Sequence, residues 1–317
     1  MRGVLDGTTV DRIEVIDNVS RIIHPYREWQ TFLETAVEPD LNIVISNTTE
    51  AGIRYVPEAY FEDVCPVEFP AKLCRWLYAR YSNLKPETTT FMLPCELIED
   101  NGDRLRECVL AYADYWSLAP GFTEYVRSRC HFANTLVDRI VSGRPAADSD
   151  LYGQLDFADE LLTAAEPYHL WAIEADEALQ AAFPLDRTAF NTVFTDDLEK
   201  YRTLKVRILN GLHILMVLTG LPEGVATVAD YVAHPKWGPW LQRVLHEEII
   251  PALPYPAPEC KAYAEQVMDR FRNPFLHHQL SDIALNTEEK VRVRLEPTMA
   301  AYRAKFGRGP ALLEEVV

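Results

Sequence analysis

The amino-acid sequence predicts an α/β protein whose first half alternates strands with helices and whose second half is mostly helical. Short runs rich in β-branched residues alternate with amphipathic runs up to about residue 200. Beyond that point the apolar residues recur at helical spacing. The composition, with 48% hydrophobic and 25% charged residues in a chain of 317, is that of an ordinary globular protein.

Three short segments in the first half have the pattern of strands. Residues 12–17 alternate between polar and apolar side chains, as a half-buried strand does. Residues 41–46 form a nearly continuous apolar run, which is typical of a strand buried on both faces, and residues 88–93 form a third run. We therefore expect a largely parallel sheet.

Amphipathic segments lie between these strands, and further helices follow them. In the first half, residues 26–36, 71–81 and 104–116 place apolar side chains three and four positions apart. In the second half, the helical pattern covers residues 205–220, 238–250, 257–271, 275–285 and 288–306, with Pro or Gly between them. The change of pattern predicts two domains, residues 1–199 and 200–317.

One motif of a nucleotide-binding α/β domain is missing from the sequence. Such a domain opens with a strand that leads into G-x-G-x-x-G and then into a helix. The first 60 residues contain no such motif. Either the domain binds no dinucleotide, or its first βαβ unit is absent from this chain. The residues alone leave both alternatives open, and a family resemblance, carried by the motifs given below, implies an incomplete Rossmann-like domain followed by a mostly α-helical domain.

The charge balance excludes several classes of partner. The chain has 31 Lys and Arg against 48 Asp and Glu, a net charge of −17, and no block rich in Lys and Arg. Nucleic acids and anionic membranes bind cationic surfaces, so neither is expected as a partner. The apolar stretch 208–221 is interrupted by Asn210 and His213 and is shorter than the ~20 residues of a membrane-spanning helix. The N-terminus has no secretion-type hydrophobic run, and we expect a cytoplasmic protein.

Neither cysteine nor histidine spacing predicts a metal site. The six cysteines fall at irregular spacings without a C-x-x-C pair, so buried free thiols are the favoured interpretation. His277 and His278 are adjacent, and side chains of such neighbours on a helix point about 100° apart. The run His246-Glu247-Glu248 lacks the second histidine of a zinc-binding helix. No metal is expected.

Polar residues on an otherwise apolar helix are the strongest candidates for chemistry. Lys205, Asn210 and His213 fall within a helical arc of about 140°, so one broad face presents an amine, an amide and an imidazole. Such groups must be hydrogen-bonded if buried, or they line a cavity, so a structural amide and histidine remain an alternative. A buried lysine is rarer, because desolvation lowers its pKa and makes it a proton acceptor near neutral pH.

Two further polar segments are candidates. Asn134 could join Asn210 as a donor to a carbonyl oxygen that becomes alkoxide-like, and the alternative is a cap or turn residue. A polar loop also follows the most strand-like run, where ligands bind in open α/β sheets, and the alternative is a plain loop of capping side chains. Its residues are Ser46, Asn47, Thr48 and Thr49.

Together these segments resemble the polyol-specific long-chain dehydrogenases, the mannitol dehydrogenase family. The resemblance extends almost from end to end and is carried by residues 46–53 (SNTTEAGI), 93–102 (LPCELIEDNG), 134–140 (NTLVDRI), 205–213 (KVRILNGLH) and 270–274 (RFRNP). The spacing Lys-x4-Asn-x2-His with an upstream Asn-x3-Asp-Arg-Ile is specific to that family. The form SNTTEAGI points to the tagaturonate branch over the mannitol and fructuronate branches.

The resemblance implies roles for individual residues. Lys205 would be the catalytic lysine, which protonates the ketone oxygen during reduction and removes the hydroxyl proton in the reverse direction. Asn134 and Asn210 would hold and polarise that oxygen, and His213 would orient the substrate. The loop Ser46–Thr49 would contact the NAD cofactor.

The substrate end is less well matched. Lys290 stands at a family position that contacts the substrate, but Asp282 stands where mannitol-type members have a substrate-binding arginine. A hexuronate is anionic and is repelled by a chain of charge −17, so local cations must offset that field. Arg207 or Arg294 could contribute, with solvated surface arginines as the alternative.

The implied activity is metal-independent, NAD(H)-dependent reduction of a hexuronate ketone, D-tagaturonate to D-altronate. Hydride transfer leaves negative charge on the former ketone oxygen, which a lysine and two amides can stabilise. The resemblance also implies segments before residue 1 and after residue 317, so we expect low activity of this polypeptide alone. A fructuronate reductase, a mannitol-type polyol dehydrogenase and a non-catalytic remnant remain alternatives, and the oligomeric state is not predicted.

Overall fold

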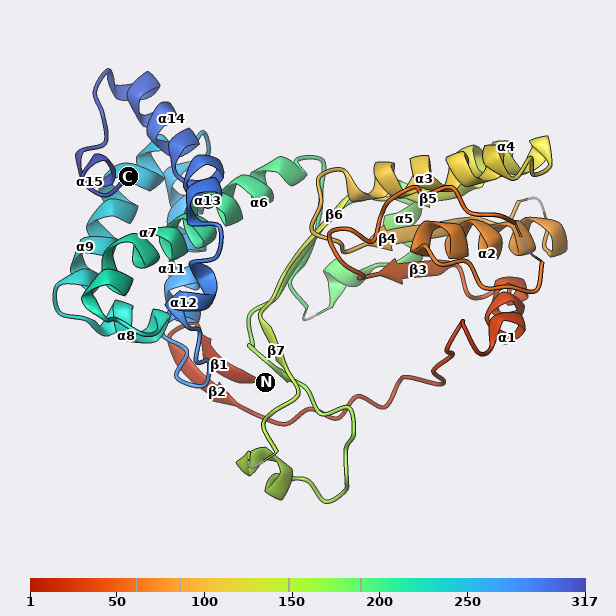
Figure 1. The fold of residues 1–317 in the computed structure, drawn as a ribbon, viewed down its shortest axis with the longest axis horizontal. Coiled ribbons are helices and arrows are strands. Elements are labelled where there is room, and N and C mark those ends of the chain that lie inside the picture. Colours follow the sequence, from red (N-terminus) through yellow and green to blue (C-terminus); the bar gives the residue numbers. More distant parts are fainter. Residues whose placement is uncertain (61, 86, 148, 189) are drawn as a thin grey trace. The chain divides into compact units, whose positions relative to one another are not determined.

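The computed structural model describes residues 1–60, 62–85, 87–147, 149–188 and 190–317, which form two compact units (Figure 1). The helical unit consists of residues 1–14, 139–169 and 199–317, and the sheet unit of residues 15–138 and 170–198. The chain therefore passes from one unit to the other near residues 14, 138, 169 and 198. The sequence domains 1–199 and 200–317 stay a prediction.

A parallel sheet forms the middle of the sheet unit. Its strands are β3 (Ile43–Ser46), β4 (Thr90–Pro94) and β5 (Cys130–Phe132), in the order β3-β4-β5. All of β4 is buried, because Met92 packs in one apolar cluster while Phe91 and Leu93 pack in another. The strands predicted at 41–46 and 88–93 are confirmed. Ser46 pairs with Pro94, so β3 and β4 end at one edge of the sheet.

A second sheet in the same unit has mixed direction. Its strands are β6 (Thr135–Asp138), β9 (Leu170–Glu174) and β10 (Thr192–Thr195), in the order β10-β9-β6. β9 and β10 are parallel, whereas β6 is antiparallel to β9. Within this unit the expected parallel arrangement therefore holds for β3, β4 and β5 and for the β9–β10 pair, and it is wrong for β6.

Helices accompany the sheets of this unit. They are α1 (Trp29–Glu34) with the 3₁₀ turn Thr35–Val37, α2 (Phe69–Asn83), α3 (Asn101–Tyr115), α4 (Pro120–Arg129), α5 (Glu177–Ala182) and the 3₁₀ turn Leu185–Arg187. Pro70 and Pro120 stand in the first turns of α2 and α4, where the missing N–H costs no helical hydrogen bond. The helices predicted at 26–36, 71–81 and 104–116 are confirmed as α1, α2 and α3, with different bounds.

The strand predicted at residues 12–17 is wrong. Those residues are not in a strand, and Val15 and Ile16 are 63% and 68% exposed. The N-terminal strands are instead β1 (Arg2–Leu5) and β2 (Thr8–Asp11), an antiparallel hairpin. Asp6 and Gly7 both have positive φ, 50° and 71°, which suits the tight hairpin turn that Asp-Gly favours. The Asp6-Gly7 turn therefore fixes the two strands at residues 2–5 and 8–11, ahead of the alternating pattern at 12–17.

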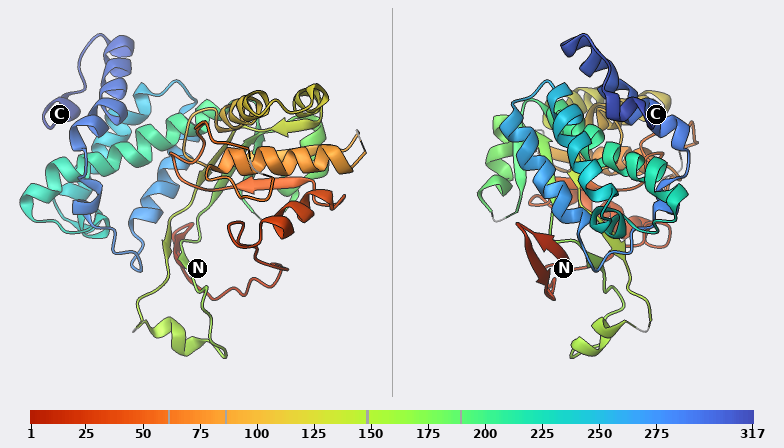
Figure 2. Two further views of the ribbon diagram at one scale, coloured as in Figure 1. Left: turned by 45° about the vertical axis from the view of Figure 1, so that its right-hand side comes forward. Right: turned by 90° about the vertical axis from the view of Figure 1, so that its left-hand side faces the viewer.

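The helical unit is built around one continuous helix, seen from two further directions in Figure 2. This helix comprises α6 (Leu198–Leu204), a π-helical turn (Lys205–Asn210), α7 (Gly211–Gly220) and a 3₁₀ turn (Leu221–Glu223). The remaining helices are α8 (Val228–Ala233), α9 (Trp237–Val244), a second π-helical turn (Leu245–Ile249), α10 (Ile250–Ala252), α11 (Ala257–Phe271), α12 (Leu280–Ile283), α13 (Thr287–Arg294), α14 (Glu296–Phe306) and α15 (Ala311–Glu314).

The predicted helices of this region differ in outcome. The segment 257–271 coincides with α11, and helix is confirmed over 205–220 and 238–250. The prediction for 275–285 is wrong over 275–279, because Asn273 accepts the N–H of Phe275 and Gln279 forms a β-bridge with Thr227. The prediction for 288–306 becomes α13 and α14, separated at Leu295, two residues before Pro297.

The helix Leu198–Glu223 is the core of the helical unit. Its 26 residues are long and apolar enough to cross a membrane, but 67% of its most apolar window is buried inside the protein. The side chains of Ile208, Leu212 and Leu215 are completely buried. Such burial is that of a core helix, whose apolar surface is covered by the other helices of its unit.

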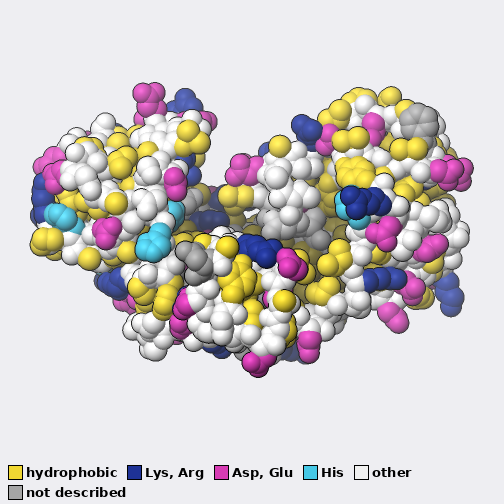
Figure 3. Space-filling model, turned by 60° about the horizontal axis from the view of Figure 1, so that its bottom comes forward, with side chains coloured by type: hydrophobic (Ala, Val, Ile, Leu, Met, Phe, Trp, Pro, Cys, Tyr) yellow, Lys and Arg dark blue, Asp and Glu magenta, His cyan; other side chains and the backbone are white. Residues whose placement is uncertain are grey.

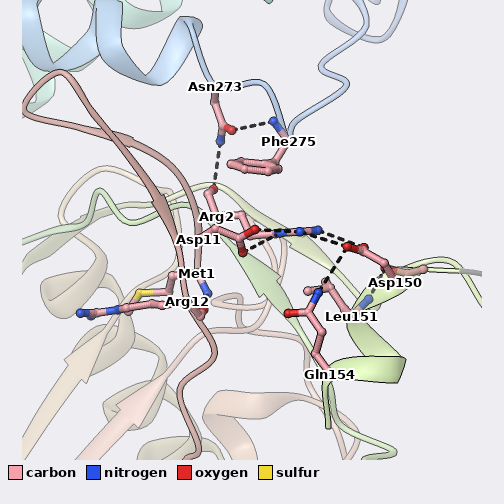
Figure 4. A network of polar contacts seen from close by, with 10 residues as sticks. Met1, Arg2, Asp11, Arg12, Asp150, Leu151, Gln154, Asn273 and Phe275 are labelled. Atoms are coloured by element: carbon pink, nitrogen blue, oxygen red, sulfur yellow. Dashed lines mark hydrogen bonds and ion pairs between the residues drawn. The ribbon is translucent and has the colours of Figure 1, made fainter.

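An arm and the N-terminal hairpin complete this unit. The arm, residues 139–169, contains the antiparallel pair β7 (Val141–Gly143) and β8 (Ala164–Ala165) and the 3₁₀ turn Asp150–Gln154. The Arg2 guanidinium donates to Asp11 at 2.9 Å and to Asp150 at 3.3 Å, a network drawn in Figure 4. Asn273 donates to the Arg2 carbonyl at 3.2 Å, so the hairpin ties the arm to the loop after α11.

Candidate active site

The loop Ser46–Thr49 leaves β3 at the edge where β3 and β4 end. Ser46 is buried, whereas Asn47, Thr48 and Thr49 are exposed. The buried Glu96 carboxylate accepts the Ser46 hydroxyl at 2.9 Å, the Thr48 hydroxyl at 2.8 Å and the Thr48 N–H at 2.9 Å. In the described parts of the chain the side chains of Asn47 and Thr49 have no hydrogen-bond partner. Their polar groups are therefore available to a ligand.

Asn134 lies between α3 and β9 in the same unit. Its carboxamide oxygen accepts the N–H groups of Gly102 at 3.0 Å and Asp103 at 3.2 Å, in the first turn of α3. Its NH₂ group donates to Asp103 at 3.0 Å and to Glu174 at 2.9 Å. Asn134 thus acts as a helix cap, the alternative considered from the sequence, and both its amide hydrogens are engaged.

Lys205 and Asn210 are the first and last residues of the π-helical turn. In a π-helix the hydrogen bonds join residues five apart, so these two side chains are brought closer to one face than in an α-helix. Both residues are half-buried, so Lys205 is not the fully buried lysine considered above. Within the described residues the Asn210 carboxamide has no hydrogen-bond partner. Single π turns inside α-helices are frequent at functional sites.

His213 lies one turn further along the same helix and is buried. Its ring packs on Phe271 and His278, with centroid distances of 4.8 and 4.9 Å. Burial, aided by His278, Arg270 and Arg294, lowers the pKa of His213 well below its usual value, so the imidazole stays neutral. Its Nε2 atom is buried without a hydrogen-bond partner in the described structure. A buried nitrogen in this condition is suited to bonding a ligand.

Three cationic side chains belong to this part of the helical unit. Arg207 lies in the π turn itself, and Lys290 and Arg294 lie on α13, which packs against α7. Burial lowers the pKa of Arg207 and Arg294, and burial together with the charge of Arg294 lowers the pKa of Lys290. None of the three forms an ion pair within the described residues, and all are half-buried, so their charges are in part exposed to solvent. Lys290 donates to the Ile283 carbonyl at 2.8 Å, and Asp282 is exposed.

The predicted site residues thus fall into two groups. Lys205, Asn210 and His213 share one helix of the helical unit, and Lys290 lies on α13, which packs against α7. Asn134 and the loop Ser46–Thr49 belong to the sheet unit. The meeting of Asn134 with Lys205 and Asn210 around one oxygen atom stays a prediction, as do the roles of all these residues.

The histidine and acidic segments considered for metal binding have other contacts. The buried Glu248 carboxylate accepts the N–H groups of Leu312 and Leu313 at 2.8 and 2.9 Å, at the start of α15. His278 packs on His213. The described residues contain no group of three His, Cys, Asp or Glu that could hold a metal ion. The cysteines are free, but Cys65 and Cys108 are half-buried, not buried as expected.

Glu96 and Asn101 were missed as site residues. They are 2% and 1% exposed and hydrogen-bond the segments that carry Ser46, Thr48 and Thr135. The available signal was an acid and an amide in the segment between a strand buried on both faces and the next helix, because such residues need local partners if they are buried.

Comparison with known proteins assigns both parts of the chain. The mannitol dehydrogenase Rossmann domain matches residues 5–187 and the mannitol dehydrogenase C-terminal domain matches residues 197–315. The altronate oxidoreductases of Halalkalibacterium halodurans and Bacillus subtilis are 42% and 39% identical over 316 residues. These matches cover 99% of this chain but 62% and 65% of those proteins, so the chain spans less than two thirds of their length.

Two solved structures share the fold. A D-sorbitol dehydrogenase in substrate-free form superposes with a TM-score of 0.71 at 22% identity, over 89% of this chain and 60% of that protein. The mannitol 2-dehydrogenase of Pseudomonas fluorescens, in a ternary complex with NAD and D-mannitol, gives 0.67 at 20% identity, over 95% and 63%. With a Rossmann-like first part, a helical second part and both domain matches, the chain belongs to the mannitol dehydrogenase family.

Proposed function

We propose that this chain carries the active-site residues of an NAD(H)-dependent oxidoreductase that interconverts D-tagaturonate and D-altronate. The observation that carries the proposal is the placement of Lys205 and Asn210 at the two ends of one π turn, with the neutral His213 following. The names of the two relatives at 42% and 39% identity support the choice of substrate.

The proton chemistry follows from the side chains of this helix. During reduction the Lys205 ammonium gives a proton to the ketone oxygen, and in the reverse direction its amine takes the hydroxyl proton. The unpaired Asn210 carboxamide donates a hydrogen bond to the same oxygen as negative charge develops. His213, neutral and with Nε2 unpaired, holds a substrate hydroxyl. The family resemblance assigns Asn134 to the same oxygen, and its two amide hydrogens bind Asp103 and Glu174.

Some of the residues that follow β3 are suited to contact a nicotinamide cofactor. Asn47 and Thr49 offer exposed polar groups at the carboxyl edge of parallel strands, where open α/β sheets bind ligands. When bound, NADH supplies the hydride. Ser46–Thr49 would contact the cofactor at this edge, and no G-x-G-x-x-G follows a strand within the 317 residues of this sequence.

The charges suit a small anionic substrate. Lys290, Arg207 and Arg294, each without a carboxylate partner in the described structure, would receive the hexuronate carboxylate. Figure 3 shows one face on which Lys and Arg are interspersed with Asp and Glu, without a continuous basic area there. We propose a cytoplasmic enzyme that acts on a small molecule, without nucleic acid, membrane or metal. The net charge of −17 is consistent with this proposal.

A substrate panel tests the proposal. The purified chain is mixed with NADH and D-tagaturonate, D-fructuronate or D-fructose, and NADH absorbance is followed. Oxidation of NADH with tagaturonate above the other two ketones is the expected result. Preference for fructuronate or fructose would assign the chain to the fructuronate reductases or the mannitol-type polyol dehydrogenases.

A non-catalytic role is the second candidate, and the observation that favours it is that Asp103 and Glu174 already engage both amide hydrogens of Asn134. An amide engaged in this way has no hydrogen left for a ketone oxygen. Calorimetric titration with NADH separates the two cases. Heat of binding supports an oxidoreductase, whereas a folded chain without any heat of binding supports a protein that keeps the fold and has lost the reaction.

A further inference from the structure

The segment Leu93–Gly102 carries two buried polar side chains that the proposed chemistry does not use. Glu96 is 2% exposed and Asn101 is 1% exposed. Burial of a carboxylate or a carboxamide is unfavourable unless hydrogen bonds replace those to water. The hydrogen-bond partners of these two side chains therefore indicate what they do.

The Glu96 carboxylate is directed at the start of the loop Ser46–Thr49. One oxygen accepts both the N–H and the hydroxyl of Thr48, at 2.9 and 2.8 Å, and the other accepts the Ser46 hydroxyl at 2.9 Å. Within the described parts of the chain Glu96 forms no ion pair. Its acceptor atoms are thus satisfied by the loop, and the loop is fixed by Glu96.

Asn101 joins three segments of backbone. Its NH₂ group donates to the carbonyls of Pro94, Glu96 and Thr135 at 2.9, 3.0 and 2.9 Å, and its oxygen accepts the Thr135 N–H at 2.9 Å. Thr135 directly follows Asn134, whose carboxamide caps α3. Asn101 therefore fixes the backbone that carries Asn134 against the end of β4.

We propose that Glu96 and Asn101 are positioning residues: Glu96 sets the loop Ser46–Thr49 for the cofactor, and Asn101 sets Asn134 for the ketone oxygen. The inference rests on the proposed function, which gives the loop and Asn134 those roles. Both are tied to the carboxyl end of β4 through residues 96–101. Such placement matters because a displacement of about 1 Å can slow a reaction about a hundredfold.

Paired variants of Glu96 separate its hydrogen-bonding role from its charge. In Glu96→Gln, the amide oxygen can accept from Thr48 while the NH₂ group donates to the Ser46 hydroxyl, so the loop is expected to keep its place. Glu96→Ala removes all three hydrogen bonds. Ser46→Ala and Thr48→Val each remove a hydroxyl donor from the loop side and serve if Glu96→Ala does not fold. Glu107→Gln, an exposed position on α3, is the matched control.

Two readouts are needed, and the first does not depend on the cofactor. Hydrogen exchange followed by mass spectrometry reports the protection of residues 46–52, with α2 as an internal reference. Calorimetric titration reports NADH affinity. For Glu96→Ala we expect faster exchange in residues 46–52, unchanged exchange in α2 and an NADH affinity weakened about tenfold or more. Glu96→Gln is expected to restore both values to near those of the parent.

Asn101→Ala tests the second half of the proposal. Exchange is expected to rise in residues 133–136, and kcat is expected to fall about tenfold or more while NADH affinity changes less. An equal fall of kcat and affinity would indicate general loss of structure and would overturn a specific role towards Asn134.

The other outcomes are equally distinct. Unchanged exchange in residues 46–52 of Glu96→Ala overturns the positioning role of Glu96. Faster exchange with parental NADH affinity overturns its connection to the cofactor. A parent chain that binds no NADH contradicts the proposed function itself, and the exchange data then still decide whether Glu96 holds the loop.

Discussion

Glu166 and Arg270 form an ion pair in which both side chains are almost completely buried, with 2% and 1% of their surface exposed. Nη2 of Arg270 lies 2.9 Å from Oε1 of Glu166, and the same oxygen accepts the N–H of Ile140 at 2.6 Å. The guanidinium also lies over the ring of Tyr168, 4.3 Å from its centroid. This pair fixes the arm to α11 inside the helical unit.

Removal of one partner should therefore be strongly destabilising. Glu166→Ala removes the carboxylate that faces the buried Arg270 guanidinium, which is expected to lower the free energy of unfolding by about 3–5 kcal/mol. Urea unfolding followed by circular dichroism measures the change. The control is Glu314→Gln in the exposed pair with Arg303, for which a change of about 0–1 kcal/mol is expected. Equal effects of the two substitutions would contradict the structural role of the buried pair.

The proton donor can be tested through Lys205. Lys205→Ala is expected to lower kcat for ketone reduction by about 10²–10⁴-fold, because the developing oxyanion loses its acid. NADH affinity, measured by calorimetry, should not change. Lys261→Ala, at an exposed position on α11, is the control. A Lys205→Ala variant that keeps most of the parental rate would show that another group supplies the proton.

The buried histidine predicts a pH dependence of stability. The pKa of His213 is lowered in the folded chain, so below the unfolded value of about 6.5 the unfolded chain binds a proton that the native protein does not. The free energy of unfolding should then fall as pH decreases below about 6.5, by up to ~1.4 kcal/mol per pH unit from this group. His278, whose pKa is lowered in the same direction, adds to the slope.

Unfolding by urea between pH 5 and pH 8 measures this slope. His213→Leu should reduce it, because the substituted side chain takes up no proton on unfolding. His246→Leu, at an exposed position, should leave it as in the parent. Parallel pH profiles for the parent and His213→Leu would refute the assignment.

The backbone of Gly102 lies close to that of Ala133 and Asn134, so one added methyl group at Gly102 should lower the stability of the protein. A Cβ atom at Gly102 would lie 2.5 Å from the carbonyl oxygen of Ala133 and 2.9 Å from the nitrogen of Asn134. Gly102→Ala must therefore push α3 away from the segment that carries Asn134, and we expect a loss of about 1–3 kcal/mol of stability. Thermal unfolding measures it. Gly153→Ala, where no atom lies within 4 Å, should change little, and a comparable loss there would exclude the steric explanation.

The hydrophobic pattern of the sequence correctly predicted those helices and strands in which the pattern is strong. The run 257–271 coincides with α11, and the apolar run 41–46 contains β3, because each pattern reflects the burial of its own segment. The same reasoning placed Lys205, Asn210 and His213 on one helix. It failed at residues 12–17, where the alternation is present but no strand forms.

The sequence by itself determined the family, the strands within 41–46 and 88–94, and the helix that carries Lys205. Only the tertiary structure decided the π turn at 205–210, the burial of His213 and the hydrogen bonds of Glu96 and Asn101. The physical reason is distance along the chain. Glu96 meets Ser46 across 50 residues and Asn101 meets Thr135 across 34, and hydrogen bonds of that range leave no periodic trace in a sequence.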